Sequence, residues 1–196
     1  MTKSDLLSRL QAEINSIESG VTPTQLDITS KAESSSEDSA LLEDKPAAEK
    51  AFKKIIALVN VSDRSERAIR QRLQREDFEE AAIEEAIQRA KQYGFIDDMR
   101  FAEILIRSRV SQQKGSAGIV RELSENGIQA DDVPGWPYDY PVSYDEELNR
   151  ALEVLNRKPP RAKNKRDAAY RRLIQKGYPS SVASSAARIW TEQHSE

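Results

Sequence analysis

The chain contains no cysteine, only one histidine and few aromatic side chains. The absence of cysteine excludes disulfide bonds and thiolate metal sites. His194 lies two residues from the end of the sequence, where we expect it to be solvated. Because aromatic residues make up only 6% of the chain, we expect a core of thin layers of Leu, Ile, Val and Ala between secondary-structure elements.

Long apolar runs are also missing. No segment approaches the length of a membrane span, and the first residues lack the apolar stretch of a signal peptide. No glycine-rich loop resembles a phosphate cradle, and an acidic pair such as Asp97-Asp98 more often caps a helix than holds a metal. We therefore expect a cytoplasmic protein that is not an enzyme, without catalytic residues, metal or cofactor.

Apolar residues recur at intervals of fifty along the chain. Each of three leucines precedes an apolar or aromatic residue by five positions; the pairs are Leu73 and Phe78, Leu123 and Ile128, and Leu173 and Tyr178. Gly127 and Gly177 precede the last residue of the two later copies, and Asp77 takes that place in the first. A helical unit of this length cannot bury its apolar face alone, so copies must stack. The pattern predicts an all-α fold of tandem three-helix repeats in an elongated curved array.

Composition and helix signals predict four segments. Residues 1–46 are acidic and rich in Ser and Thr, which is typical of a largely disordered head with one candidate short helix. A first helical repeat over 47–97 begins with a helix at Ala47, and Ser65 is a candidate cap for its second helix. A second repeat over 98–142 is irregular because its third helix is replaced by a proline- and aromatic-rich loop around Trp136.

The last predicted repeat covers 143–196. Ser143 is a candidate cap for its first helix, and two further helices are expected over 165–175 and 179–191. Leu173, Ile174 and Ala168 are expected to form part of its core.

Charge is distributed unevenly along the chain. Residues 1–50 contain five basic and ten acidic side chains, whereas residues 157–176 contain nine basic side chains and one acid, Asp167. A surface that tolerates such repulsion often binds phosphates or a carboxylate-rich protein. For the clusters that lie near glutamates, an ordinary solvated helix face is the alternative. The candidate binding residues are Arg64, Arg67, Arg70, Arg72, Arg107, Arg109, Lys114, Arg121, Lys163, Lys165, Arg166, Arg171 and Arg172.

The middle third carries a family resemblance. The stretch from Tyr93 to Ala102, the run from Lys114 to Ile128 and the preceding Arg64–Leu73 segment are similar to the RecX family. The resemblance implies a non-enzymatic regulator that binds the RecA filament on single-stranded DNA and inhibits its recombinase and ATPase activities. It also implies single-stranded DNA as a partner, with duplex DNA as a weaker alternative without strong sequence preference. We expect a monomer that does not bind membranes.

The resemblance is not uniform. A helix is usual in the family where this chain has residues 134–141, and a glycine is usual in place of Asp77. Two other classes of function remain open on sequence. A helix-turn-helix-type transcription factor predicts tight preference for one duplex sequence. A helical protein-interaction adaptor predicts no salt-sensitive DNA binding.

Overall fold

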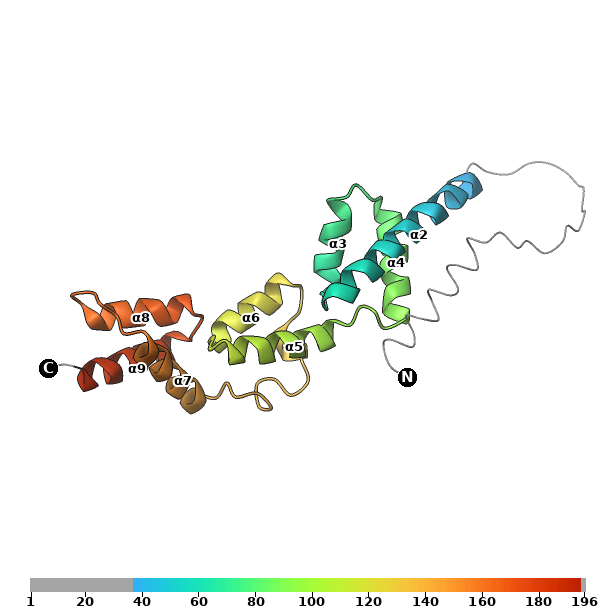
Figure 1. Cartoon of the computed structure of the whole chain (residues 1–196). Helices are drawn as coiled ribbons and strands as arrows, with labels where there is room; N and C mark the ends of the chain where they lie inside the picture. Colours follow the sequence, from blue (N-terminus) through green and yellow to red (C-terminus); the bar gives the residue numbers. More distant parts are fainter. Residues whose placement is uncertain (1–36, 195–196) are drawn as a thin grey trace, which may run out of the picture. The chain divides into compact units, whose positions relative to one another are not determined.

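The computed structural model describes residues 37–194, and this part of the chain consists of helices, turns and loops without a strand (Figure 1). Three helices form a first module, two helices and a 3-10 turn form a second, and three helices form a third. The elements are α2 (Glu37–Val61), α3 (Glu66–Gln74), α4 (Glu80–Gln92), α5 (Asp98–Ser111), α6 (Ser116–Glu125), η1 (Ala130–Asp132), α7 (Tyr144–Arg157), α8 (Lys165–Gln175) and α9 (Ser180–Gln193). The prediction of an all-α repeat fold with an irregular second repeat is confirmed.

The start of the first helix differs from the sequence prediction. A helix from Ala47, preceded by disorder through residue 46, is wrong for residues 37–46, because α2 begins at Glu37 and contains Pro46. The prediction rests on how little apolar surface this segment can bury. However, it also contains Ala, Leu, Glu and Lys, which have high intrinsic helix propensity. The rest of the predicted head, including its candidate short helix, lies outside the described residues.

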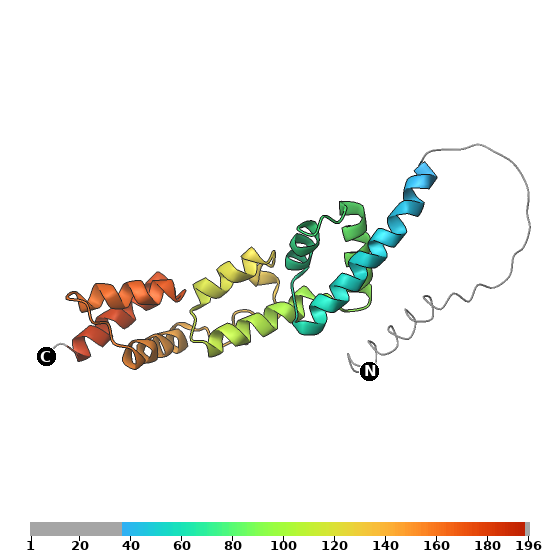
Figure 2. The ribbon, with the colours of Figure 1, turned by 45° about the horizontal axis from the view of Figure 1, so that its top comes forward.

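The first module buries one side of α2 against α4. Phe52 and Ile55 of α2 have no exposed surface, and Ile83 and Ile87 of α4 are equally buried. α3 packs against α4, and Figures 1 and 2 both show α2 and α4 side by side. The predicted cap of α3 is confirmed, because the Ser65 side chain accepts a hydrogen bond from the Ala68 amide at 3.2 Å.

The second module packs α5 against α6 and closes with an ordered loop in place of a third helix. Ile106, Ile119 and Leu123 are fully buried in its core. In the loop, Trp136 packs against this core and its ring lies 5.7 Å from the ring of Tyr140. The loop therefore covers the helix pair with aromatic side chains, as the sequence predicts.

The third module packs α9 against both α7 and α8 (Figure 2). Leu173 and Trp190 are buried in its core, as is Ala169. The sequence predicts Ile174 in this core, but Ile174 is 39% exposed, and Ala168 is only partly buried. Leu173 and Ala169 lie one turn apart on the buried face of α8, and the next residue is rotated by about 100° away from that face.

The fifty-residue repeat corresponds to a repeated helix cap. At the end of α3, α6 and α8, the amide of the apolar residue donates to the carbonyl of the repeat leucine five positions earlier, at 3.3, 3.0 and 3.0 Å. The residue just before the apolar residue has a positive φ: 58° at Asp77, 83° at Gly127 and 86° at Gly177. This is the Schellman arrangement, in which a left-handed residue ends the helix and an apolar contact follows. Asp77 therefore adopts the conformation that glycine adopts in the later copies.

The cap of the third module also meets the start of a helix in the preceding module. Gly118 at the start of α6 donates its amide to the Gly177 carbonyl at 2.8 Å, and Gly115 donates to the Lys176 carbonyl at 3.2 Å. A side chain on Gly115 would lie 2.3 Å from the Tyr178 backbone. Glycine is therefore required where these two backbones approach.

The first and second modules are joined in a related way. At the start of α3, the Glu66 amide donates to the Asp98 carboxylate at 2.8 Å, and Ser65 donates to the Asn126 side chain at 3.0 Å. At the start of α6, the Ser116 amide and hydroxyl donate to the Glu147 carboxylate at 2.6 and 2.9 Å. At both junctions, an acidic side chain from the next module caps the free amides of a helix start.

Candidate functional site

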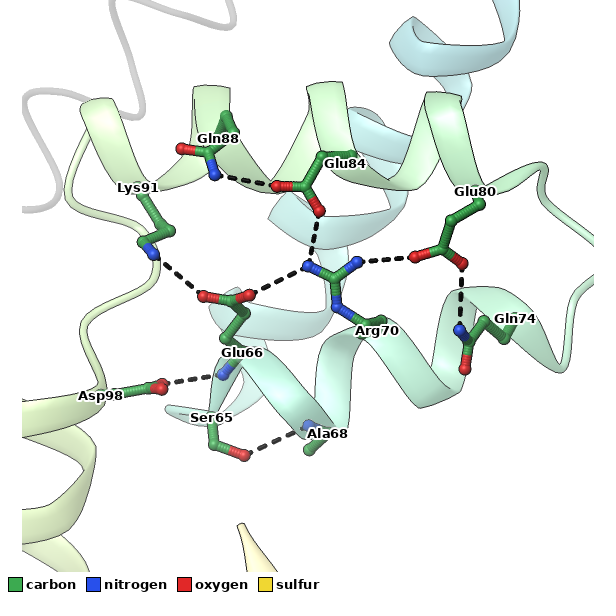
Figure 3. A network of polar contacts seen from close by, with 10 residues as sticks. All are labelled: Ser65, Glu66, Ala68, Arg70, Gln74, Glu80, Glu84, Gln88, Lys91 and Asp98. Atoms are coloured by element: carbon green, nitrogen blue, oxygen red, sulfur yellow. Dashed lines mark hydrogen bonds and ion pairs between the residues drawn. The ribbon is translucent and has the colours of Figure 1, made fainter. Parts of the chain in front are cut away.

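Arg70 lies at the centre of a polar network between α3 and α4 (Figure 3). Its guanidinium donates to Glu66 at 3.0 Å, to Glu80 at 2.8 Å and to Glu84 at 2.7 Å. Lys91 contacts the second oxygen of Glu66 at 3.0 Å. Three carboxylates therefore surround one guanidinium, and the network joins the two helices.

The charges of this network hold one another in their ionised forms. Hydrogen bonds from Arg70 to Glu84 and Glu66 raise the pKa of the Arg70 guanidinium. For Glu66, burial is the largest influence and raises the pKa, but hydrogen bonds from Lys91 and Arg70 outweigh it and lower the pKa overall. We infer that Arg70, a candidate binding residue by sequence, is engaged in holding the first module together.

Arg109 has a similar structural engagement in the second module. Its guanidinium forms two hydrogen bonds to the Glu122 carboxylate, at 2.7 and 2.5 Å, and so joins α5 to α6. The hydrogen bond from Arg109 lowers the pKa of Glu122. Both side chains are about three-quarters buried, which makes this pair stronger than an exposed one. Lys114 is 3.9 Å from the same carboxylate.

Two further candidates are exposed arginines that form ion pairs with a glutamate four positions away in sequence. Arg72 lies 2.8 Å from Glu76, and Arg107 lies 3.5 Å from Glu103. Exposed pairs of this kind contribute about 0.3–0.5 kcal/mol. Such an arginine can exchange its partner for a phosphate at little cost, so both remain available to a ligand.

Two candidates lie near the junction of the first and second modules. Arg67 is exposed, and its side chain lies beside Gly127, so that a Cβ on this glycine would be 3.3 Å from Arg67 Cδ. Arg64 is half-buried, and its buried Nε has no hydrogen-bond partner among the described residues.

Several candidate cations of the third module are exposed. Lys163, Arg166 and Arg171 are exposed, as is Arg121 of α6, and none of these has an ion pair within residues 37–194. Two other predicted residues bond to carbonyls: Lys165 donates to His194 at 3.1 Å, and Arg172 donates to Lys158.

Sequence reasoning missed three cations that the fold gathers around Arg172. Arg157, Lys158 and Lys176 line a hollow between α5, α7 and α8 together with Arg172. All three lie in the basic run 157–176, and the high positive charge of this run could have indicated them as binding residues. Linear spacing does not show that the end of α7 and the end of α8 meet at one place.

The described residues hold neither a membrane span nor a metal cluster. No helix in residues 37–194 combines the length and the apolar character needed to cross a bilayer. In the same part of the chain, no three His, Cys, Asp or Glu side chains converge in a way that suits a metal ion.

Comparison with known proteins identifies the family. A family model described as the first three-helix domain of RecX matches residues 51–89, and one described as its second three-helix domain matches residues 97–133. "Regulatory protein RecX" of Oceanobacillus iheyensis is 34% identical over 152 residues, which are 74% of this chain and 55% of that relative. The chain belongs to the RecX family.

Other relatives agree with this assignment. "Regulatory protein RecX" of Listeria innocua is 29% identical over 70% of this chain and 53% of its own length. This RecX-family chain thus spans about half the length of the curated relatives it matches. The crystal structure of RecX from Lactobacillus salivarius superposes with a TM-score of 0.59 at 18% identity, covering 75% of this chain and 98% of that one. A second crystal structure, of regulatory protein RecX, gives a TM-score of 0.61 at 19% identity, covering 87% and 82%. These two structures support the fold.

Proposed function

We propose that this protein regulates the RecA recombinase by binding the RecA filament on single-stranded DNA and inhibiting its recombinase and ATPase activities. Membership of the RecX family supports a regulatory role. Lys163, Arg166 and Arg171 of the third module are the observation that carries the proposal, because these exposed cations have no carboxylate partner among the described residues. They suit either the phosphates of the filament DNA or an acidic protein surface.

The proposed binding set is smaller than the set of candidates from sequence. Arg70 and Arg109 are held by glutamates within their own modules and are assigned a structural role. Arg121, Lys163, Arg166 and Arg171 form the exposed binding set, and Arg67 extends it to the first module. No base-reading motif is evident in the sequence, so binding to DNA is expected to be largely independent of sequence.

The helix-turn-helix alternative predicts tight preference for one duplex sequence. A recognition helix presents free side chains to the major groove, and Arg70 of α3 is held by three glutamates instead. The adaptor alternative predicts no salt-sensitive DNA binding. Both alternatives are therefore separated from the proposal by DNA-binding measurements across sequences and salt concentrations.

RecA assays test the proposal directly. Single-strand-dependent ATP hydrolysis and strand exchange by RecA are measured with and without this protein, and we expect both to fall. Inhibition far below one protein per recombinase monomer indicates binding at filament ends, whereas inhibition only near saturation indicates binding along the filament. Unchanged RecA activity at saturating protein would refute the proposed function.

A charge-reversal variant tests the exposed set. Lys163→Glu, Arg166→Glu and Arg171→Glu are combined, and we expect weaker inhibition with an unchanged circular dichroism spectrum, because all three side chains are exposed. The salt slope of binding should fall by roughly 0.7 for each phosphate of a single strand that the variant no longer neutralises. Full inhibition by the folded variant would refute the role of this set.

A further inference from the structure

A hollow of 380 Å³ lies where the second module meets the third. It is lined by Ser111, Gln112 and Gln113 at the end of α5, by Val154, Arg157 and Lys158 at the end of α7, and by Arg172 of α8 and Lys176 just after it. We call this the junction hollow. Half of its lining residues are basic, and none is acidic.

The four cations of the junction hollow have no carboxylate partner among the described residues. Arg172 donates to the Lys158 carbonyl, and the Lys176 ammonium lies 3.4 Å from the Gln112 carbonyl. None of the four cations, Arg157, Lys158, Arg172 and Lys176, forms an ion pair within residues 37–194. Glu153 adjoins the hollow, where it accepts a hydrogen bond from Gln113 at 3.1 Å. Positive charge therefore exceeds negative charge at this place.

The neighbouring hollow on the same junction shows the contrast. Lys114, Arg121 and Lys176 line it together with Glu122 and Glu125, so acids and bases are mixed there. Basic and acidic side chains are also mixed in the first module, where Arg70 is surrounded by glutamates. Only at the junction hollow, among the cavities described within residues 37–194, do several cations converge without a lining acid.

We propose that the junction hollow binds consecutive phosphate groups of a single DNA strand. This deepens the proposed function and rests on it. Two arginines supply planar donors that match phosphate oxygens in pairs, and two lysines supply mobile point charges. Four cations exceed the charge of one phosphodiester, so the site suits more than one adjacent phosphate.

The lining favours a nucleic acid over a protein partner. Protein interfaces are anchored by aromatic and other large apolar side chains in buried pockets, but Val154 is the only apolar side chain in this lining. The lining also contains no aromatic ring on which a base could stack. The site therefore holds the strand by its backbone, and it draws on both the second and the third module to do so.

Neutralisation of three cations tests the site. We combine Arg157→Gln, Lys158→Gln and Lys176→Gln and leave Arg172 in place, because its bond to the Lys158 carbonyl joins α8 to the end of α7. Binding of fluorescein-labelled oligothymidylate to the full chain, without RecA, is followed by fluorescence anisotropy over a series of salt concentrations. We expect affinity to fall about tenfold or more and the salt slope to fall by about 2.

A matched variant controls for net charge. Lys50→Gln, Arg75→Gln and Arg188→Gln remove the same charge from positions outside the hollow. We expect this variant to lose no more than about twofold in affinity, since distant exposed charges are largely screened by salt. Equal losses in the two variants, or no loss in the hollow variant, would overturn the proposal. Thermal unfolding of both variants establishes that each is folded.

Two further measurements separate other ligands from a DNA strand. ATP carries adjacent phosphates without a strand, and we expect it not to displace the oligothymidylate at equal phosphate concentration. Displacement by ATP would make this a nucleotide site and overturn the assignment to a strand. Loss of RecA inhibition with unchanged oligothymidylate affinity would assign the hollow to the recombinase instead. If the hollow variant loses DNA affinity while even the unaltered chain leaves RecA activity unchanged, the site stands and the proposed function fails.

Discussion

Replacing Gly177 with alanine should break the junction between the second and third modules, and Gly127→Ala is its matched control. Both glycines end a helix with nearly the same positive φ, 86° and 83°. They differ in what a new Cβ would meet. At Gly177 it would lie 2.5 Å from the Gly118 backbone, whereas at Gly127 it would lie 3.3 Å from the flexible end of the Arg67 side chain.

The magnitudes follow from this difference. A non-glycine residue in the left-handed region costs about 1–2 kcal/mol, and both variants bear this cost. At Gly177 the backbone collision adds overpacking, and the bond from the Gly118 amide to the Gly177 carbonyl, 2.8 Å long, is broken as well. Overpacking costs about 1–3 kcal/mol and a hydrogen bond about 1 kcal/mol, so Gly177→Ala should be less stable than Gly127→Ala by about 2–4 kcal/mol.

Chemical denaturation measures the two free energies of unfolding. Urea titrations are followed by circular dichroism and by tryptophan fluorescence, since Trp136 reports on the second module and Trp190 on the third. We expect a lower midpoint for Gly177→Ala, with the larger change in the third module. Equal free energies for the two variants would show that the close approach of Gly118 and Gly177 does not contribute to stability.

Two further substitutions test the core and the junction acid. Leu123→Ala should destabilise the protein by about 2–5 kcal/mol in the same titration, because Leu123 is fully buried; a loss within error would mean that the repeat leucines are not core. Glu147→Gln should flatten the pH dependence of stability just above pH 4.5, the ordinary pKa of a glutamate. Burial raises the pKa of folded Glu147 despite the bonds from Ser116, so the folded state holds a proton longer than the unfolded state, and stability falls as pH rises through this range. An unchanged pH profile in the variant would show that Glu147 is not responsible for that fall.

The helices and the repeat could be predicted from the sequence because their causes are local. Apolar spacing sets which face of a helix is buried. Gly127 and Gly177 mark helix ends because glycine readily adopts the left-handed conformation that ends a helix. The recurrence of Leu73, Leu123 and Leu173 indicated stacked units. The same local signals were insufficient at α2, because residues 37–46 have few apolar side chains but several residues of high helix propensity, and the helix begins at Glu37.

The candidate site depended on which residues meet across helices. The sequence alone determined that basic residues are concentrated between 157 and 176. Only the tertiary structure decided that Arg70 faces three glutamates from two helices, whereas Arg157 and Lys176 converge with no lining acid. Charge acts through space over a few ångströms, so whether a cation is neutralised depends on packing between distant segments. Composition determined the total charge, and the fold determined where that charge is free to bind.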